Sequence, residues 1–430
     1  MIYETAGVRG LKGEIIVPAD KSISHRTLML SALAAGESSV TNLLGAEDVQ
    51  STARCLRDLG VPITSKGEKM LISGCGLFGF QEPFDVLDCG NSGTTMRLMS
   101  GILAAQPFLS VVTGDASLRK RPMRRVADPL CQMGARIDGR DQGRLAPLAI
   151  RGGGLQPITY RLPMASAQVK SSILLAGLHT EGETTVLENV PTRDHTERML
   201  KSMGASIEWT PGRIQIRGLS SLNPQDWFVP GDISSAAFFL VAASIVSEAE
   251  VLLRDVGVNP TRTGILEALT AMGADISAVN QRSIGGEPVA DLAVRPAPLK
   301  PVTLKGPIIP RLIDEIPVLA IAMAMADGIS MVRDADELRA KESDRIRMIC
   351  SLLDAIGVAN EELPDGFVVH GKGVIPGGAT VSSGGDHRIA MAASVAGLAA
   401  RAAIRIDGFD CVAISYPGFA EDVQRLIDQA

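Results

Sequence analysis

Apolar and polar residues alternate with a helical period in six segments of the chain. Five of these segments end in Leu, Met or Ile followed by Gly and then by Val or Ala, usually with an Ile shortly afterwards. A glycine directly after a helical pattern is the usual left-handed cap, and a β-branched residue beyond it favours a strand. We therefore predict five helix–turn–strand units, whose capping glycines are Gly60, Gly134, Gly204, Gly273 and Gly357.

The spacing of these glycines divides the chain into units of similar length. The glycines lie 74, 70, 69 and 84 residues apart, and a sixth helical pattern begins near Glu421. Six units in 430 residues give about 72 residues each, a period too long for a solenoid repeat. The pattern therefore predicts an α/β protein built from six related units.

A second similarity groups the six units into two sets of three. Pro-Ala-Asp-Lys-Ser at 18–22 and Pro-Gly-Asp-Ile-Ser-Ser at 230–235 lie 212 residues apart, each between a strand-like and a helix-like run. We expect two similar α/β domains, and one large doubly wound sheet is the alternative. The predicted domains are residues 21–228 and residues 1–20 plus 229–430, with crossovers near 20 and 229.

Composition excludes several classes of protein. Hydrophobic residues make up 46 % of the chain, too many for a disordered protein, and aromatic residues make up 3 %, too few for base stacking. The net charge of −6 argues against a nucleic-acid partner. The longest apolar runs reach only about half of the ~20 residues that a membrane span needs, and the first residues lack a secretion pattern. We expect a cytoplasmic protein that binds neither membrane nor nucleic acid.

Basic and hydroxyl residues gather where strand-like runs give way to helix-like runs. Residues 20–26 and 90–97 lie at such junctions, and residues 119–125 contain five cations. Helix N-termini attract anions through free N–H groups and the helix dipole. Taken singly, helix capping explains residues 20–26 better, a simple turn explains residues 90–97 better, and a run of cations such as 119–125 usually means a solvated face. Taken together, the segments predict a receptor for at least two anionic groups.

Carboxylates accompany the cations in the second half of the chain. Asp314 and Glu315 precede an apolar helix-like run, and Lys341 and Arg345 share a helix face beside Glu342. Binding of anions does not require acids among the cations, whereas proton transfer does. We therefore expect an enzyme, and a non-catalytic anion-binding protein is the alternative. The cysteines form no Cys-x-x-Cys pair and the histidines are isolated, so we expect neither metal nor cofactor.

Ten short segments occur in order along the whole chain: DKSISHR, GNSGTTMR, GDASLRKRPM, PMASAQVKS, TRDHTE, PGDISSAAF, NPTRTG, IDE, KESDR and DHRIAM. These ordered segments resemble the 5-enolpyruvylshikimate-3-phosphate synthase family of enolpyruvyl transferases. The resemblance implies two inside-out, barrel-like α/β domains, each of three βαβαββ repeats. It also implies transfer of the enolpyruvyl group of phosphoenolpyruvate to the 5-hydroxyl of shikimate 3-phosphate, with release of phosphate through a tetrahedral intermediate. This reaction belongs to the shikimate pathway to chorismate and the aromatic amino acids.

The resemblance also implies roles for particular residues. Asp314 would accept the 5-hydroxyl proton, Glu342 would protonate the methylene carbon, and Lys21 would complete the catalytic set. Shikimate 3-phosphate would be bound by Lys21, Ser22, Arg26, Ser166, Ala167, Gln168, Arg193, Asp314 and Lys341. Phosphoenolpyruvate would be bound by Lys21, Gly93, Arg121, Gln168, Arg345 and Arg388. The inhibitor glyphosate would lie at the same place as phosphoenolpyruvate.

Two positions depart from the family pattern. Ala19 replaces the Gly of the usual Pro-Gly-Asp-Lys, and Ile414 stands where some members carry a Lys that touches phosphoenolpyruvate. The nearest alternative is the sister family that acts on UDP-N-acetylglucosamine through a loop Cys. No Cys lies between Cys89 and Cys131, which disfavours it. We expect a monomer whose partners are small anionic substrates.

Overall fold

The computed structural model describes all 430 residues and divides them into two units. Unit 1 comprises Met1–Pro18, Pro230–Arg282 and Pro288–Ala430, and unit 2 comprises Ala19–Val229 and Ser283–Glu287. Each unit has its own hydrophobic core, and the two cores share no residue. The strands form seven separate sheets, so the alternative of one large doubly wound sheet is wrong.

One short segment departs from the expected division. β16 (Asp275–Ile284) and β17 (Glu287–Arg295) are neighbouring strands of unit 1, yet the turn between them groups with unit 2. The Glu287 carboxylate lies 2.8 Å from Nδ1 of His195, and both side chains are buried. Because this partner lies 92 residues away in the chain, the local pattern of the hairpin gives no sign of it.

Five four-stranded sheets share one strand order. In each, the first strand pairs in parallel with the second, and the second pairs antiparallel with the third. In unit 2 the sheets are β14 (Asp226–Phe228), β3 (Ala35–Thr41), β5 (Lys69–Cys75) and β4 (Ile63–Lys66); β6 (Leu87–Asp88), β7 (Leu109–Thr113), β9 (Leu145–Arg151) and β8 (Arg136–Gly139); β10 (Thr159–Arg161), β11 (Glu183–Leu187), β13 (Arg213–Arg217) and β12 (Ile207–Thr210).

The sheets of unit 1 include two of this order and two smaller ones. The four-stranded sheets are β2 (Gly10–Ile15), β15 (Glu248–Gly257), β17 and β16; and β18 (Thr303–Leu304), β19 (Asp327–Val332), β21 (Gly366–Lys372) and β20 (Asn360–Leu363). The smaller sheets are β1 (Ile2–Thr5), β25 (Ile404–Asp407) and β23 (Thr380–Ser382); and β22 (Ile375–Gly377) with β24 (Ala400–Ala402).

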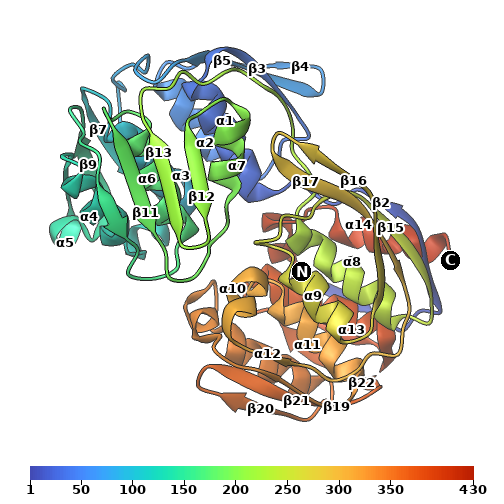
Figure 1. Cartoon of the computed structure of the whole chain (residues 1–430). Coiled ribbons are helices and arrows are strands. Elements are labelled where there is room, and N and C mark those ends of the chain that lie inside the picture. The colour runs from blue at the N-terminus through green and yellow to red at the C-terminus, as the bar shows by residue number, and fades with distance from the viewer. The chain divides into compact units, whose positions relative to one another are not determined.

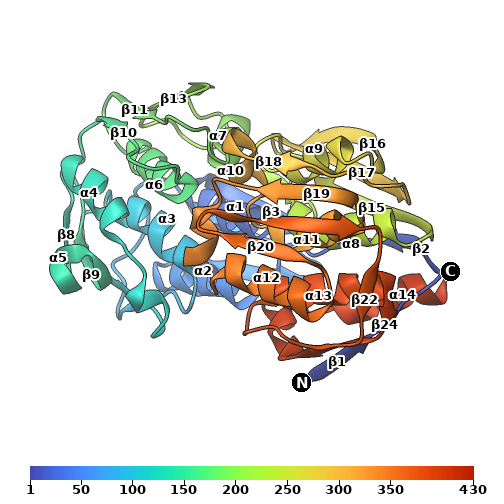
Figure 2. The same ribbon diagram turned by 90° about the horizontal axis from the view of Figure 1, so that it is seen from below.

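Six helices are buried along nearly their whole length, three in each unit (Figures 1 and 2). They are α1 (Lys21–Leu33), α3 (Gly93–Leu103) and α6 (Ala167–Gly177) in unit 2, and α8 (Ile233–Ile245), α11 (Ile316–Met325) and α13 (His387–Ala399) in unit 1. Within each unit, each of the three packs against a different sheet: α1 on β5, α3 on β7, α6 on β11, α8 on β15, α11 on β21 and α13 on β25. α8 and α11 are apolar on nearly all sides, and such a helix is stable only inside a core.

Six further helices have one apolar face. They are α2 (Glu47–Asp58), α4 (Arg124–Gln132), α7 (His195–Ser202), α9 (Gly264–Ala271), α12 (Arg345–Ala355) and α14 (Phe419–Asp428). Short helical turns are α5 (Arg140–Gly143), α10 (Ile309–Leu312), η1 (Leu118–Lys120), η2 (Gly306–Ile308), η3 (Asp336–Ala340) and η4 (Phe409–Ile414). The left-handed glycine caps are confirmed, with φ of 86°, 110°, 88°, 87° and 81° at Gly60, Gly134, Gly204, Gly273 and Gly357.

Candidate active site

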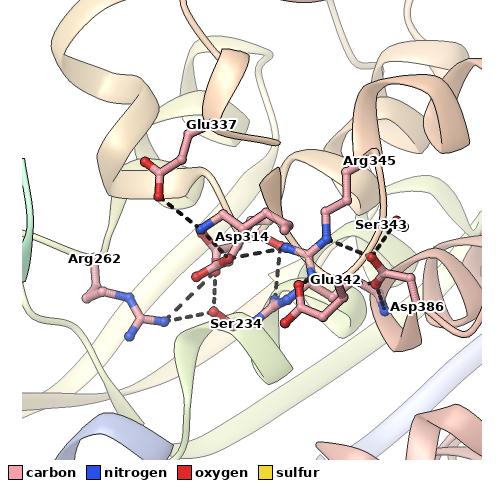
Figure 3. Close-up of polar contacts among 11 residues, drawn as sticks. Ser234, Arg262, Asp314, Glu337, Glu342, Ser343, Arg345 and Asp386 are labelled. Carbon is pink, nitrogen blue, oxygen red and sulfur yellow. Dashed lines mark hydrogen bonds and ion pairs between the residues drawn. The ribbon is translucent and has the colours of Figure 1, made fainter. Parts of the chain in front are cut away.

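Three carboxylates surround the guanidinium of Arg345 in unit 1 (Figure 3). Its Nε lies 2.9 Å from Asp386, its NH1 3.4 Å from Asp314 and its NH2 2.6 Å from Glu342. The Arg345 side chain is 1 % exposed. A buried cation needs such compensation, because low-dielectric surroundings penalise an isolated charge. The sequence assigned Arg345 to a substrate anion, whereas here it is bound by the protein's own acids.

Two further cations contact Asp314, which lies two residues before α11. Nζ of Lys341 lies 3.7 Å from its carboxylate, and NH1 of Arg388 donates to its main-chain oxygen at 2.9 Å. Lys341 also lies 3.5 Å from the exposed Glu337. The structure therefore brings Asp314, Lys341, Glu342, Arg345 and Arg388 together in one unit.

The pKa values of Glu342, Asp386 and His387 in this cluster depend on burial and on the neighbouring cations. Desolvation favours protonation of Glu342, but the charges of Arg345 and Arg388 and a main-chain hydrogen bond together outweigh it and hold the pKa of this carboxyl below its usual value. Desolvation also opposes ionisation of Asp386, but the charge and hydrogen bond of Arg345 and the hydrogen bond from Ser343 together lower its pKa. Burial and the adjacent Arg388 lower the pKa of His387 to about 4, which leaves its imidazole neutral near pH 7. Both carboxyl groups are therefore ionised and His387 is not a cation.

A second polar group lies beside this cluster, at the start of α8 and α11. Ser234 donates a short hydrogen bond to Glu315, and NH2 of Arg262 donates to Ser234 at 2.7 Å. Burial raises the pKa of Glu315, and the negative charge of Asp314 raises it further. The positive charge of Arg262 opposes this shift without reversing it. Ser234 and Arg262 lie in segments that the resemblance quoted, but they were not singled out as site residues.

In unit 2 the candidate residues lie at helix starts. Asp20 accepts a hydrogen bond from a main-chain N–H group of α1, so the capping interpretation of this segment is confirmed. Ser92 and Ser166 cap α3 and α6 in the same way. Ala167 is the first residue of α6, and Arg193 lies two residues before α7.

The basic residues of α1 bind neighbours that the sequence did not indicate. Nζ of Lys21 lies 3.1 Å from Asp48. Arg26 is 4 % exposed and donates to Thr196 and Ser171, both at 2.8 Å, and at 3.0 Å to the main-chain oxygen of Ser22. Burial lowers the pKa of Arg26 to about 10, so it remains a cation near pH 7.

Gln168 and Arg121 lie in polar networks of the same unit. Oε1 of Gln168 accepts from Arg97 at 2.6 Å, and its Nε2 donates to Thr94 at 3.0 Å. NH2 of Arg121 donates to Asn91 at 2.8 Å. Arg97 was part of a quoted segment, four residues after Gly93, and this helical spacing is the signal that could have singled it out.

The two departures from the family pattern have different surroundings. Ala19 is buried and does not have a positive φ, so its side chain costs no backbone strain. Ile414 is 58 % exposed. The Ala19 substitution is therefore neutral for the backbone.

The chain has neither a cluster of metal-ligating side chains nor a helix that could span a membrane. No three His, Cys, Asp or Glu side chains are grouped so that they could hold a metal ion. None of the helices combines the length and the apolar character needed to cross a bilayer.

The fold is that of an enolpyruvyl transferase: the enolpyruvyl transferase NikO from Streptomyces tendae superimposes with a TM-score of 0.76 over 99 % of this chain and 97 % of its own, at 18 % identity. The match to the family model for EPSP synthase (3-phosphoshikimate 1-carboxyvinyltransferase) is more specific and spans residues 5–423. The chain belongs to this family. Its members transfer the enolpyruvyl group from phosphoenolpyruvate to shikimate 3-phosphate in the shikimate pathway.

Relatives and solved structures agree with this assignment. The 3-phosphoshikimate 1-carboxyvinyltransferase of Pelotomaculum thermopropionicum is 54 % identical over 96 % of both chains, and that of Gloeobacter violaceus is 55 % identical over 99 % of both. EPSP synthase from Acinetobacter baumannii superimposes with a TM-score of 0.93 at 46 % identity, over 99 % of this chain and 98 % of its own. The resemblance stated from the sequence is confirmed, and the sister family is not supported.

Proposed function

We propose that this chain transfers the enolpyruvyl group of phosphoenolpyruvate to the 5-hydroxyl of shikimate 3-phosphate, and releases phosphate, through a tetrahedral intermediate. Family membership carries the overall reaction, and the assignment of its steps to residues is our own. The observation that supports the assignment is the contact of one buried cation, Arg345, with both Asp314 and Glu342. A base and an acid are both needed, because one proton leaves the hydroxyl and another reaches the methylene carbon.

Asp314 is the proposed base. Lys341 and Arg345 lie 3.7 and 3.4 Å from its carboxylate, and two nearby cations favour the ionised form. The bond from Arg388 to its main-chain oxygen restrains this segment. The carboxylate takes the 5-hydroxyl proton while the oxygen forms its bond to C2 of phosphoenolpyruvate.

Glu342 is the proposed acid, and it must first acquire a proton. Despite desolvation, Arg345, together with Arg388 and a main-chain hydrogen bond, keeps its pKa below the usual value. We expect the carboxylate of phosphoenolpyruvate to displace Glu342 from Arg345. Loss of this ion pair raises the pKa of the half-exposed Glu342 carboxyl group, which then takes up the proton that it delivers to the methylene carbon. Substrate binding thus prepares the acid. In the second step the C2–O bond to phosphate breaks, phosphate leaves, and the methyl group of the tetrahedral intermediate gives up a proton, for which we propose the Glu342 carboxylate as the acceptor.

The remaining candidates are assigned to substrate anions. Lys21 breaks its ion pair with Asp48 to bind substrate, and it is the third proposed catalytic residue. For shikimate 3-phosphate we propose Lys21, Ser22, Arg26, Ser166, Ala167, Gln168, Arg193, Asp314 and Lys341. For phosphoenolpyruvate we propose Lys21, Gly93, Arg121, Gln168, Arg345 and Arg388. Fixed cations of this kind hold developing charge without reorganisation during the reaction.

The finer points of architecture also belong to this proposal. The common order of five sheets and the three buried helices in each unit support six βαβαββ repeats in two inside-out domains. We assign shikimate 3-phosphate chiefly to the N-terminal domain, residues 21–228. We propose a cytoplasmic monomer that needs no cofactor or metal.

An assay of phosphate release tests the function directly. With phosphoenolpyruvate, release should require shikimate 3-phosphate, and mass spectrometry should detect the enolpyruvyl ether. Phosphate release that does not depend on shikimate 3-phosphate would overturn the proposal.

A further inference from the structure

Arg97 is a buried cation without a carboxylate partner. The residue is 5 % exposed, and its one hydrogen bond goes from NH1 to the amide oxygen of Gln168. Its Nε is buried and has no hydrogen-bond partner. Burial, followed by the charges of Arg125 and Arg121, lowers the pKa of Arg97 to about 9. Burying a cation close to other cations is energetically unfavourable, so the position of Arg97 calls for a functional explanation.

The bond from Arg97 fixes which way the Gln168 carboxamide points. A guanidinium can only donate, so the oxygen of the carboxamide must face it. The nitrogen end then donates one hydrogen to the Thr94 hydroxyl at 3.0 Å. Its second hydrogen is left for a ligand. If the carboxamide flipped, its NH₂ group would face the NH1 donor, so the orientation is set by Arg97.

The same guanidinium lies directly beside Gly93. A Cβ on this glycine would stand 2.7 Å from NH1 of Arg97 and 3.4 Å from NH1 of Arg121. Gly93 does not have a positive φ, so backbone conformation does not require glycine here. The space above Gly93 is instead taken by Arg97, and any larger residue must displace it.

We propose that Arg97 is a positioning residue for the transfer reaction: it holds the Gln168 carboxamide with its N–H end toward the substrates. This inference rests on the proposed function, which assigns Gln168 to both substrates. Gly93 contributes to this positioning, because its missing side chain leaves room for the Arg97 guanidinium. Arg97 acts through Gln168 and is not itself assigned a bond to substrate.

A double-mutant cycle tests the proposal. Arg97→Lys keeps the charge but loses the planar fork, and Gln168→Ala removes the carboxamide. We expect each change to raise the KM for phosphoenolpyruvate by about 10- to 100-fold, the range for losing a hydrogen bond to a charged group, with a smaller effect on kcat. Because Arg97 acts through Gln168, the double variant should resemble Gln168→Ala within about threefold. Arg119→Lys, an exposed neighbour, is the matched control.

The outcomes separate this inference from the proposed function. Normal constants in Gln168→Ala would show that the substrate assignment of Gln168 is wrong. An impaired Gln168→Ala combined with a normal Arg97→Lys, or with effects that multiply in the double variant, would overturn the positioning role alone. Should Arg97→Lys not fold, as judged by thermal unfolding, Thr94→Val removes the other anchor of the carboxamide. It should raise the same KM, and an unchanged KM would overturn the proposal.

Discussion

Arg345 in unit 1 and Arg97 in unit 2 are both buried arginines near the start of a helix, but their surroundings are opposite. Carboxylates surround Arg345, and they outweigh burial to raise its pKa. Arg97 has a neutral amide as its partner, and burial together with two arginines lowers its pKa. Burial is common to both, so the charge of the neighbours decides the sign of the shift.

The different surroundings of Arg345 and Arg97 correspond to two ways in which a protein can be arranged to bind anionic substrates. A ligand that binds Arg345 must first displace an acid of the protein, and the displaced acid then changes its proton affinity. No such exchange is needed at Arg97 itself, whose one hydrogen bond goes to the neutral amide of Gln168. We infer that unit 1 couples binding to proton transfer, whereas unit 2 mainly holds and orients charge. The following changes test this contrast.

Replacing the proposed base should have the largest effect. Asp314→Asn keeps the size of the side chain but cannot accept the proton, so kcat should fall by about 10²–10⁴-fold while shikimate 3-phosphate binding changes modestly. Steady-state kinetics and calorimetry measure the two quantities. Glu337→Gln is the control, since Glu337 is exposed and also lies near Lys341. Near-normal turnover in Asp314→Asn would contradict the assignment.

Replacing the proposed acid should have the next largest effect. Glu342→Gln should lower turnover by about 10²-fold, because no group then protonates the methylene carbon. Protonation from solvent also leaves a trace: in heavy water, deuterium should enter the methylene group of the product in the wild type. The variant should lose this label together with turnover. Retained labelling at the wild-type rate would assign the proton to another residue.

A methyl group at position 93 should give a smaller, ligand-dependent effect. In Gly93→Ala the new Cβ displaces Arg97, so both ligands should bind less well. Glyphosate is longer than phosphoenolpyruvate and should suffer more. Overpacking costs about 1–3 kcal/mol, so we expect its inhibition constant to rise about 5- to 150-fold, and by more than the KM. Equal shifts in the two constants would show that position 93 does not discriminate the ligands.

The stability of the Arg345 cluster should depend on pH in a defined direction. Because the charge and hydrogen bond of Arg345 and the hydrogen bond from Ser343 together outweigh burial, the pKa of Asp386 is lower in the folded protein than its ordinary value of 3.8. Its contribution is therefore present above that value and is lost as pH falls through the folded pKa. Asp386→Asn should destabilise the protein by about 1–3 kcal/mol near pH 7, and the two proteins should converge in acid. Denaturant unfolding from about pH 7 to 2, a range that extends below the ordinary pKa, measures this, and a constant difference would contradict it.

The sequence by itself determined the features that depend on neighbours in the chain. The five capping glycines were predictable because a helix end needs a left-handed residue whatever surrounds it. The caps Asp20, Ser92 and Ser166 follow the same local rule. The family motifs, which have fixed order and spacing, were enough to identify the family and its reaction.

Only the tertiary structure decided which charges meet. Asp314 and Asp386 reach Arg345 from 31 and 41 residues away, and Gln168 reaches Arg97 from 71 residues away. Lys21 with Asp48, and His195 with the turn at Glu287, are further pairs of this kind. Such partners are chosen by the packing of whole helices and sheets, and burial then sets how strongly they interact. The local sequence contains neither the packing arrangement nor the degree of burial. It therefore predicted the charged residues of the site but not the residues that pair with them.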